Sequence, residues 1–326
     1  MDKINQGMRW QKMVAGGLCG LAILILPSVI FKSQYFLYLS SLACIYMIVS
    51  CGLNITMGYA GQISLGQAGF LGIGAYTGAL LGSTLGFWVA LPLGGLIAFV
   101  FGLGLGFPSL RVKTHFLAMV TIGFTVIVYL VLMNEQQWTG GPYGLSNIRR
   151  PFIGSFALTS PAKYHIVVAV VTFILLFFAL WGLNSPWGRA FKAIRENEGR
   201  AEMLGVSLRK YKLMAFAIGA GYAGVAGVLI GPLFGYIDPT MFALGFSFLF
   251  LLMVVVGGLG RFEGALLGAI IVAILPETLR FADKYYPIIF ALAAILIMVF
   301  MPKGCVSFVD WIYKKLTGKE ELQLTK

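Results

Sequence analysis

Two polar segments carry the residue types that could do chemistry in this chain. Residues 54–76 interleave glycines with amide and hydroxyl side chains, among them Gln62, Ser64 and Gln67. Such neutral groups can hydrogen-bond the polar parts of a solute, although they supply no strong acid or base. Residues 184–212 gather ten charged side chains of both signs. Mixed charge of this kind suits contact with another protein.

Several classes of catalytic chemistry are missing. No GxxxxGK[ST] motif occurs, so the chain has no P-loop for nucleotide phosphates. His115 and His165 are the two histidines and HExxH is absent, which excludes a zinc peptidase. Ser64 is the candidate nucleophile for an intramembrane protease, but both histidines fall at predicted span boundaries. We therefore predict no catalytic residue, no metal site and no cofactor bound by this chain.

The composition is that of a membrane protein. Hydrophobic residues make up 59% of the chain, charged residues 11%, and the mean hydropathy is +0.89. The net charge of +12 would also suit nucleic-acid binding. However, the Lys and Arg clusters lie between apolar stretches, as they do in the cytoplasmic loops of membrane proteins, so we expect no nucleic-acid partner. The four cysteines lie in or beside apolar segments without CxxC spacing, and we interpret them as small buried side chains.

The apolar stretches predict an all-α polytopic membrane protein with about ten transmembrane helices. A helix needs roughly 20 apolar residues to cross about 30 Å of hydrocarbon. The predicted spans are residues 13–31, 35–57, 61–83, 86–107, 115–133, 164–183, 211–234, 242–260, 262–281 and 284–301.

The distribution of basic residues predicts the orientation. With the N-terminus placed in the cytoplasm, 18 of the 24 Lys and Arg residues fall inside and six outside. Because basic residues favour the cytoplasmic side, this predicts an N-in, C-in arrangement. The domains are then a cytoplasmic N-terminal tail (1–12), a transmembrane domain (13–301) and a cytoplasmic C-terminal tail (302–326). Loop 184–210 would be cytoplasmic, and loop 134–163 would be the longest outside segment.

The glycine-rich segment differs from the other spans. Glycine weakens a helix by up to about 1 kcal/mol relative to alanine, so an interruption or re-entrant turn is expected near Gly58–Gly66. Broken helices mark solute sites in transporters, where freed backbone groups meet the solute. The candidate path residues are Gly58, Gly61, Gln62, Ser64, Gly66 and Gln67. Alternatively, the polar side chains of this segment hydrogen-bond neighbouring helices.

A short capped helix is predicted within residues 184–210. Ser185 would be its N-cap and Pro186 its first residue, Gly205 would end it, and Ser207 would cap the next span. The predicted apolar face consists of Ala190, Ile194, Ala201 and Leu204. The predicted i,i+4 ion pairs are Lys192–Glu196 and Glu196–Arg200. Two interpretations remain: a docking element for a partner, or a solvated loop that merely follows the positive-inside rule.

Five motifs resemble those of one transporter family. They are GYAGQISLGQAGFLGIGAY, RVKTHFLAMVTIGF, TGGPYGL, FKAIRENEGRAEMLGVSLRKYKL and LLMVVVGGLGRFEGALLGA. In this order they resemble the permease subunits of high-affinity branched-chain amino acid ABC importers, of the LivM type. The resemblance covers residues 35–301. The chain departs from the family pattern at His115, Val126 and Tyr143, which bears on the substrate more than on the architecture.

The resemblance implies a set of partners and a location. Such an importer has two homologous permease subunits, two cytoplasmic ATPases that use ATP and Mg²⁺, and a periplasmic solute-binding protein. The location would be the bacterial inner membrane. Loop 184–210 would be the coupling loop, and loop 134–163, with TGGPYGL at 139–145, would face the binding protein. The ATPase-coupling residues carried over are Arg195, Glu196, Glu198, Arg200, Ala201, Glu202 and Gly205.

The expected function is ATP-driven alternating access for Leu, Ile and Val. Within the same class the alternative is an importer of urea or short amides. From a different class, a self-sufficient secondary carrier or channel would need no partner. Ionisable residues inside the predicted spans are nearly absent, which argues against a proton-coupled carrier.

Overall fold

Most of the chain folds as a helical bundle. The structure is a computed structural model that describes Gly20, Leu292 and residues 24–28, 33–109, 114–153, 156–157, 160–278 and 304–306. The predicted tail 1–12 lies outside these residues. The predicted spans 13–31 and 284–301 and the tail 302–326 lie mostly outside them.

The elements follow the apolar pattern of the sequence. The longer helices are α2 (Gln34–Leu53), α3 (Gln67–Thr84), α4 (Phe87–Ser109), α5 (Thr114–Asn134), α7 (Pro161–Asn184), α10 (Leu208–Phe234), α11 (Leu244–Gly257) and α12 (Phe262–Thr278). The shorter ones are α6 (Gln136–Thr139), α8 (Pro186–Glu196), α9 (Glu198–Met203), the π-helix η1 (Asn54–Tyr59) and the 3₁₀-helices η2 (Gly141–Tyr143) and η3 (Pro239–Phe242).

Several helices have the length and composition of membrane spans. Within the described residues, five qualify: Gln34–Tyr59, Phe87–Phe107, Phe116–Asn134, Pro161–Asn184 and Leu208–Phe234. Leu244–Gly257 and Phe262–Leu275 are shorter apolar helices. The chain is therefore an all-α multi-pass membrane protein, as its composition predicts.

One helix begins later than the span predicted for it. The span predicted at residues 61–83 corresponds to α3, which begins only at Gln67, and residues 61–66 have no regular secondary structure. Gly61 has a φ of +71°, outside the range of a right-handed helix. The helix therefore starts only after the local glycines, with Gly66 as its N-cap residue.

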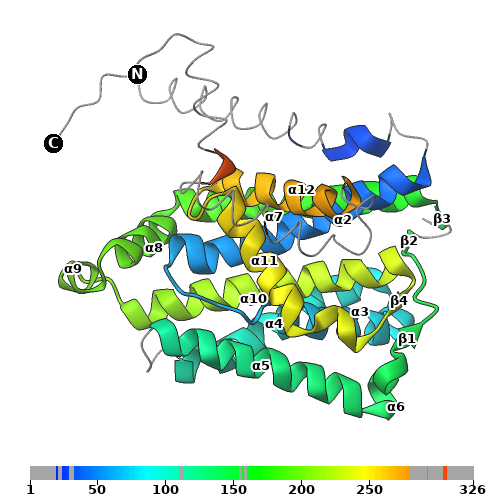
Figure 1. The fold of residues 1–326 in the computed structure, drawn as a ribbon, viewed down its shortest axis with the longest axis horizontal. Coiled ribbons are helices and arrows are strands. Elements are labelled where there is room, and N and C mark those ends of the chain that lie inside the picture. Colours follow the sequence, from blue (N-terminus) through cyan, green and yellow to red (C-terminus); the bar gives the residue numbers. More distant parts are fainter. Residues whose placement is uncertain are drawn as a thin grey trace, which may run out of the picture.

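Helix α10 is the central element of the bundle and packs against α2, α3 and α4 (Figure 1). The contacts are close because glycines lie at the crossings. A Cβ atom on Gly74 would collide with the carbonyl of Gly224, and one on Gly227 would collide with the carbonyl of Leu71. These glycines thus let the backbones approach one another.

The bundle has two distinct ends. Figure 1 shows α8 and α9 at one end and α6 with the short strands at the other. The strands, each of two residues, are β1 (Leu145–Ser146), β2 (Phe152–Ile153), β3 (Phe156–Ala157) and β4 (Tyr236–Ile237). Strand β1 pairs antiparallel with β4, and β2 with β3. The all-α prediction did not include these strands, which are too short to leave a period-two pattern.

Gly74→Ala is expected to lower the free energy of unfolding by about 1–3 kcal/mol, because its methyl group would overpack the α3–α10 crossing. Gly82→Ala is the matched control on the same helix, since no atom lies within 4 Å of its added Cβ. Thermal denaturation in detergent measures both. Equal effects from the two substitutions would contradict the role assigned to the crossing.

Candidate functional site

The helix that begins with α2 is interrupted at the glycine-rich segment. After α2 the chain forms η1, in which the amide of Ala60 donates to the carbonyl of Ile55 (3.1 Å). The amide of Gln62 then donates to the carbonyl of Thr56 (3.0 Å). Regular helix resumes only with α3. The predicted interruption near Gly58–Gly66 is confirmed.

Side chains of other helices bind the backbone of this segment. The amide of Leu65 donates to Oγ1 of Thr121 (3.0 Å), and Oγ1 of Thr125 donates to the carbonyl of Leu65 (2.9 Å). The amide of Ala68 donates to Oγ of Ser247 (3.1 Å). Irregular backbone at membrane depth is tolerated where protein replaces water as the partner. Helices α5 and α11 supply these partners.

The polar side chains of the segment are buried but not all satisfied. Gln62 is 4% exposed and Gln67 is 2% exposed. Their Oε1 atoms accept no hydrogen bond from any described residue. Ser64, also buried, accepts from the amide of Gly66 (3.4 Å). The alternative that the segment only hydrogen-bonds neighbouring helices therefore does not account for the two amide oxygens.

Among the described side chains, Ser64 has no histidine partner. His165 is buried in α7, where Nδ1 lies 3.0 Å from Oγ of Ser41 and Nε2 lies 3.0 Å from the carbonyl of Leu24. This histidine therefore joins α7 to α2. The side chain of His115 lies outside the described residues. Within the described part of the chain, no three His, Cys, Asp or Glu side chains gather.

Residues 184–210 form two short helices and not the single helix predicted. Oγ of Ser185 accepts from the amide of Trp187 (3.1 Å), which confirms the predicted N-cap of α8. Asn197 ends α8, and its Oδ1 caps α9 by accepting from the amide of Arg200 (3.0 Å). Gly205 follows α9 with a φ of +78°, as expected of a glycine that ends a helix. We call α8 and α9 together the coupling element, after the role that the family resemblance implies for loop 184–210.

Two predicted details at the end of the coupling element need correction. Ser207 occupies the N-cap position of α10 but makes no side-chain capping bond. Ala190, Ile194 and Ala201 are buried as predicted, whereas Leu204 is 81% exposed and the neighbouring Met203 is 89% exposed. The break at Asn197 changes the direction of the chain, so the helical periodicity does not continue to Leu204.

The predicted i,i+4 ion pairs are wrong, and the break at Asn197 explains only the Glu196–Arg200 pair. Glu196 and Arg200 lie on different helices and form no ion pair, and neither do Lys192 and Glu196. The ion pair that does form joins Oε2 of Glu198 to Nζ of Lys212 (2.6 Å), so it links α9 to α10. Because Glu198 is half exposed, we expect the pair to contribute at most about 1 kcal/mol.

The other carried-over residues of the coupling element are placed as follows. Glu196, Arg200, Glu202 and Gly205 are exposed at the end of the bundle. Arg195 is also exposed in part, but its Nη1 donates to the carbonyl of Gly58 in η1. Nζ of Lys192 lies 5.6 Å from the centroid of the Tyr59 ring. The structure thus brings together the two predicted sets of site residues, which the sequence analysis kept apart.

The loop between α11 and α12 completes this junction. Nδ2 of Asn54 donates to the carbonyl of Arg261 (2.9 Å), and the amide of Gly260 donates to Oδ1 of Asn54 (2.9 Å). A Cβ atom on Gly260 would collide with Nη1 of Arg195, and one on Gly58 would collide with Oδ1 of Asn54. Both positions therefore require glycine. The sequence analysis missed Asn54 and Gly260.

The TGGPYGL motif forms a compact turn at the opposite end of the bundle. Gly140, Gly141 and Gly144 all have positive φ. Oγ1 of Thr139 accepts from the amide of Gly141 (3.2 Å). The turn leaves Tyr143 94% exposed. Glycine is needed at these positions, because L residues with side chains rarely adopt the left-handed region.

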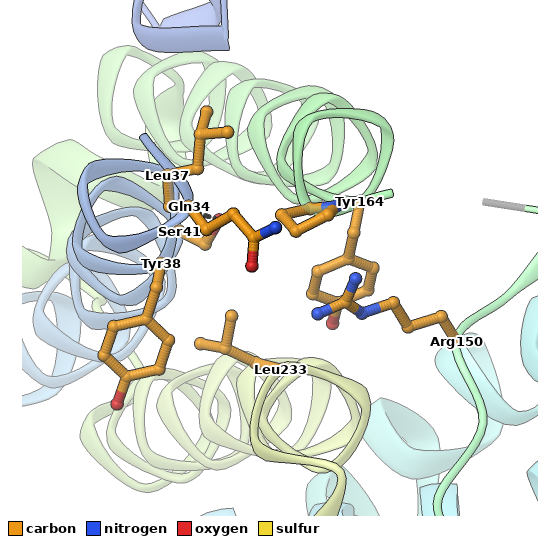
Figure 2. Close-up of a pocket in the computed structure, with 8 residues that line it drawn as sticks. Gln34, Leu37, Tyr38, Ser41, Arg150, Tyr164 and Leu233 are labelled. Atoms are coloured by element: carbon orange, nitrogen blue, oxygen red, sulfur yellow. Dashed lines mark hydrogen bonds between the residues drawn. The ribbon is translucent and has the colours of Figure 1, made fainter. Parts of the chain in front are cut away.

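A small pocket also lies at that end (Figure 2). Its volume is about 160 Å³, and its lining is Gln34, Leu37, Tyr38, Ser41, Arg150, Pro161, Tyr164 and Leu233. The Arg150 guanidinium lies 5.8 Å from the centroid of the Tyr164 ring, and Oη of Tyr164 donates to the carbonyl of Leu229 (2.5 Å). The sequence signal that could have drawn attention to it is Arg149–Arg150, a basic pair in a predicted outside loop.

Comparison with known proteins identifies the relatives of the chain. A family model described as "Branched-chain amino acid transport system / permease component" matches residues 35–302. The high-affinity branched-chain amino acid transport system permease protein LivM of Escherichia coli (strain K12) is 37% identical over 291 residues, which cover 82% of this chain and 68% of the relative.

More distant relatives have similar names. The probable branched-chain amino acid transport permease protein LivM of Methanocaldococcus jannaschii is 26% identical over 321 residues, covering 80% of this chain and 90% of the relative. The permease protein LivH of Escherichia coli (strain K12) is 25% identical over 292 residues, which cover 81% of this chain and 92% of the relative. No solved structure matches the chain.

Thr121→Val is expected to destabilise the protein by about 1–3 kcal/mol, because it leaves the buried amide of Leu65 without its acceptor. Thr77→Val is the matched control, since Oγ1 of Thr77 donates only to Ile73 of its own helix. Thermal denaturation in detergent compares the two variants. If Thr77→Val lowers the thermal stability as much as Thr121→Val does, the hydrogen bond from Leu65 to Thr121 does not support the interrupted segment.

Proposed function

The chain belongs to the family of permease components of branched-chain amino acid transport systems, and on that premise we propose that it forms half of the solute path of an ABC importer for leucine, isoleucine and valine. A second, homologous permease subunit supplies the other half. Two cytoplasmic ATPase subunits bind ATP and Mg²⁺, and a periplasmic binding protein delivers the amino acid. The chain itself catalyses no reaction and lies in the bacterial inner membrane.

The proposed topology has ten spans with both termini in the cytoplasm. Residues 1–12 and 302–326 are cytoplasmic tails, and residues 13–301 form the permease domain. The coupling loop 184–210 is cytoplasmic, and loop 134–163 is periplasmic. In support, α7 connects the two loops as a single span, and they lie at opposite ends of the bundle (Figure 1). The coupling loop also carries more Lys and Arg residues than the opposite loop.

The observation that carries the ABC mechanism is the exposed apolar tip of the coupling element. Met203 and Leu204 are 89% and 81% exposed, although the helices behind them are packed and capped. Two adjacent, exposed apolar side chains on an otherwise charged element are suited to burial in a protein interface. We assign them to a groove of the ATPase subunit, with Arg200 and Glu202 at the polar rim.

The interrupted segment is the proposed solute path within this chain. Gly58, Gly61, Ser64 and Gly66 shape it, and the Oε1 atoms of Gln62 and Gln67 are its free acceptors. Burying an unpaired acceptor costs about 1–3 kcal/mol, so an incoming donor would stabilise this site. The ammonium group of an amino acid is such a donor. Because the path is neutral, it does not select among the side chains of the transported amino acids, and the binding protein supplies that selectivity.

The mechanism is alternating access. ATP binding closes the ATPase subunits, which push on the coupling element, and the attached spans α7 and α10 tilt with it. The segment Gly58–Gln67 then opens to the other side of the membrane. The binding protein docks at loop 134–163, where the rigid TGGPYGL turn presents Tyr143.

The complex of this chain with its companion permease and ATPases, reconstituted in vesicles, is expected to take up labelled leucine in an ATP-dependent manner when the binding protein is present. Parallel assays with labelled urea test the short-amide alternative. Preferential uptake of urea would show that the importer transports urea and not leucine. Uptake by this chain alone, without ATP, would establish a self-sufficient carrier or channel and contradict the ABC mechanism.

Leu204→Glu is expected to lower co-purification of the ATPase subunits at least about tenfold, which corresponds to about 1.4 kcal/mol of interface energy. Tyr143→Glu is the matched control at the other end of the bundle. It should retain the ATPases but lose the stimulation of ATP hydrolysis by the binding protein. If Leu204→Glu retains the ATPases in pull-down assays, the tip of the coupling element is not the docking site.

A further inference from the structure

We propose that Arg195 is a positioning residue that transmits movement of the coupling element to the interrupted segment through the carbonyl of Gly58. Its guanidinium would then act inside this chain and not as a contact to the ATPase. The inference rests on the proposed function, because it requires that the coupling element be moved by a partner. It assigns to Arg195 a role different from the one that the family resemblance implies.

The carbonyl of Gly58 is available because η1 ends at Tyr59, and the last carbonyls of a helix have no partner within it. In a continuous α-helix it would accept from the amide of Gln62, four residues later. Here that amide donates to the carbonyl of Thr56 instead (3.0 Å). Nη1 of Arg195, at the last turn of α8, donates to the freed carbonyl. A charged donor makes a strong hydrogen bond, so the contact can transmit displacement as well as satisfy the carbonyl.

A second set of contacts fixes the other side of the same site. Asn54 binds both the amide of Gly260 and the carbonyl of Arg261 (2.9 Å each). A Cβ atom on Gly260 would collide with Nη1 of Arg195 and would lie 2.7 Å from the carbonyl oxygen of Gly58. The guanidinium therefore lies between η1 and the α11–α12 loop. Its movement would displace the segments that lead into the interrupted helix and into α12.

The apolar contacts between α8 and η1 do not by themselves transmit movement of α8 to residues 58–67. Phe191 of α8 packs in one cluster with Ile55 and Tyr59 of η1, so the two elements are in contact regardless of Arg195. Such a packed surface allows sliding, whereas a hydrogen bond to one carbonyl fixes the register. Without the guanidinium, we expect α8 to move over η1 without changing the conformation of residues 58–67. ATP hydrolysis would then continue with little transport.

The test is the number of amino acids imported per ATP hydrolysed. Arg195→Gln removes the charged donor, and Arg195→Lys keeps the charge but replaces the planar fork with a single ammonium. Arg189→Gln is the matched control, because it removes an exposed guanidinium from the same helix without touching Gly58. Each variant is reconstituted with the companion permease, the ATPases and the binding protein. Leucine uptake, ATP hydrolysis and melting temperature are measured together.

The expected result is a specific loss of coupling. Arg195→Gln should retain its ATPase subunits and hydrolyse ATP, while leucine imported per ATP falls at least about fivefold, roughly 1 kcal/mol by the usual conversion. Arg195→Lys should give an intermediate ratio, and Arg189→Gln the wild-type ratio. If Arg195→Gln does not fold, as judged by its melting temperature, Arg195→Lys carries the test, and a wild-type ratio for that variant overturns the proposal.

Three other results would also overturn the inference. These are an unchanged ratio for Arg195→Gln, an equal fall for Arg189→Gln, and loss of the ATPase subunits from Arg195→Gln, which would make the residue a partner contact. Each presupposes that the wild-type complex imports leucine with ATP. Failure of the wild-type complex to do so would count against the proposed function, so the two failures are distinguishable.

Discussion

The structure depends on how the backbone of residues 54–66 is satisfied at membrane depth. Lipid offers no hydrogen-bond partner, so each amide and carbonyl freed by the interrupted helix needs one from the protein. Thr121 and Thr125 bind Leu65, Ser247 binds Ala68, and Arg195 binds Gly58. These partners come from α5, α11 and α8. The interruption therefore determines which elements must meet around it.

The close crossings of α10 make this arrangement possible. Because Gly224 and Gly227 bring the α10 backbone against α3, the chain after the interruption is held near the centre of the bundle. Thr56 in η1 also donates to the carbonyl of Ala215 in α10 (3.1 Å). The interrupted segment is thus surrounded by fixed elements, while the amide oxygens of Gln62 and Gln67 accept no hydrogen bond within the described part of the chain. That combination suits a site whose partner arrives from outside the chain.

The coupling element combines a packed side and an exposed tip. Its packed side, with Phe191 and Ile194, contacts the bundle, and its tip, with Met203 and Leu204, faces away from it. Asn197 produces this division, because it ends α8 and caps α9 in a new direction. The break therefore separates the surface offered to a partner from the surface that holds the element in place.

Local sequence patterns predict the class of protein, most helix bounds, the interruption near Gly58–Gly66 and the caps at Ser185 and Gly205. These follow from apolar length, glycine content and local hydrogen bonding, which act over a few residues. Packing between distant segments sets the start of α3, the exposure of Leu204, the Glu198–Lys212 ion pair and the contact of Arg195 with Gly58. Arg195 and Gly58 lie 137 positions apart, as do many pairs that only packing brings together. Local patterns carry no information on such contacts, because the three-dimensional path of the whole chain sets them.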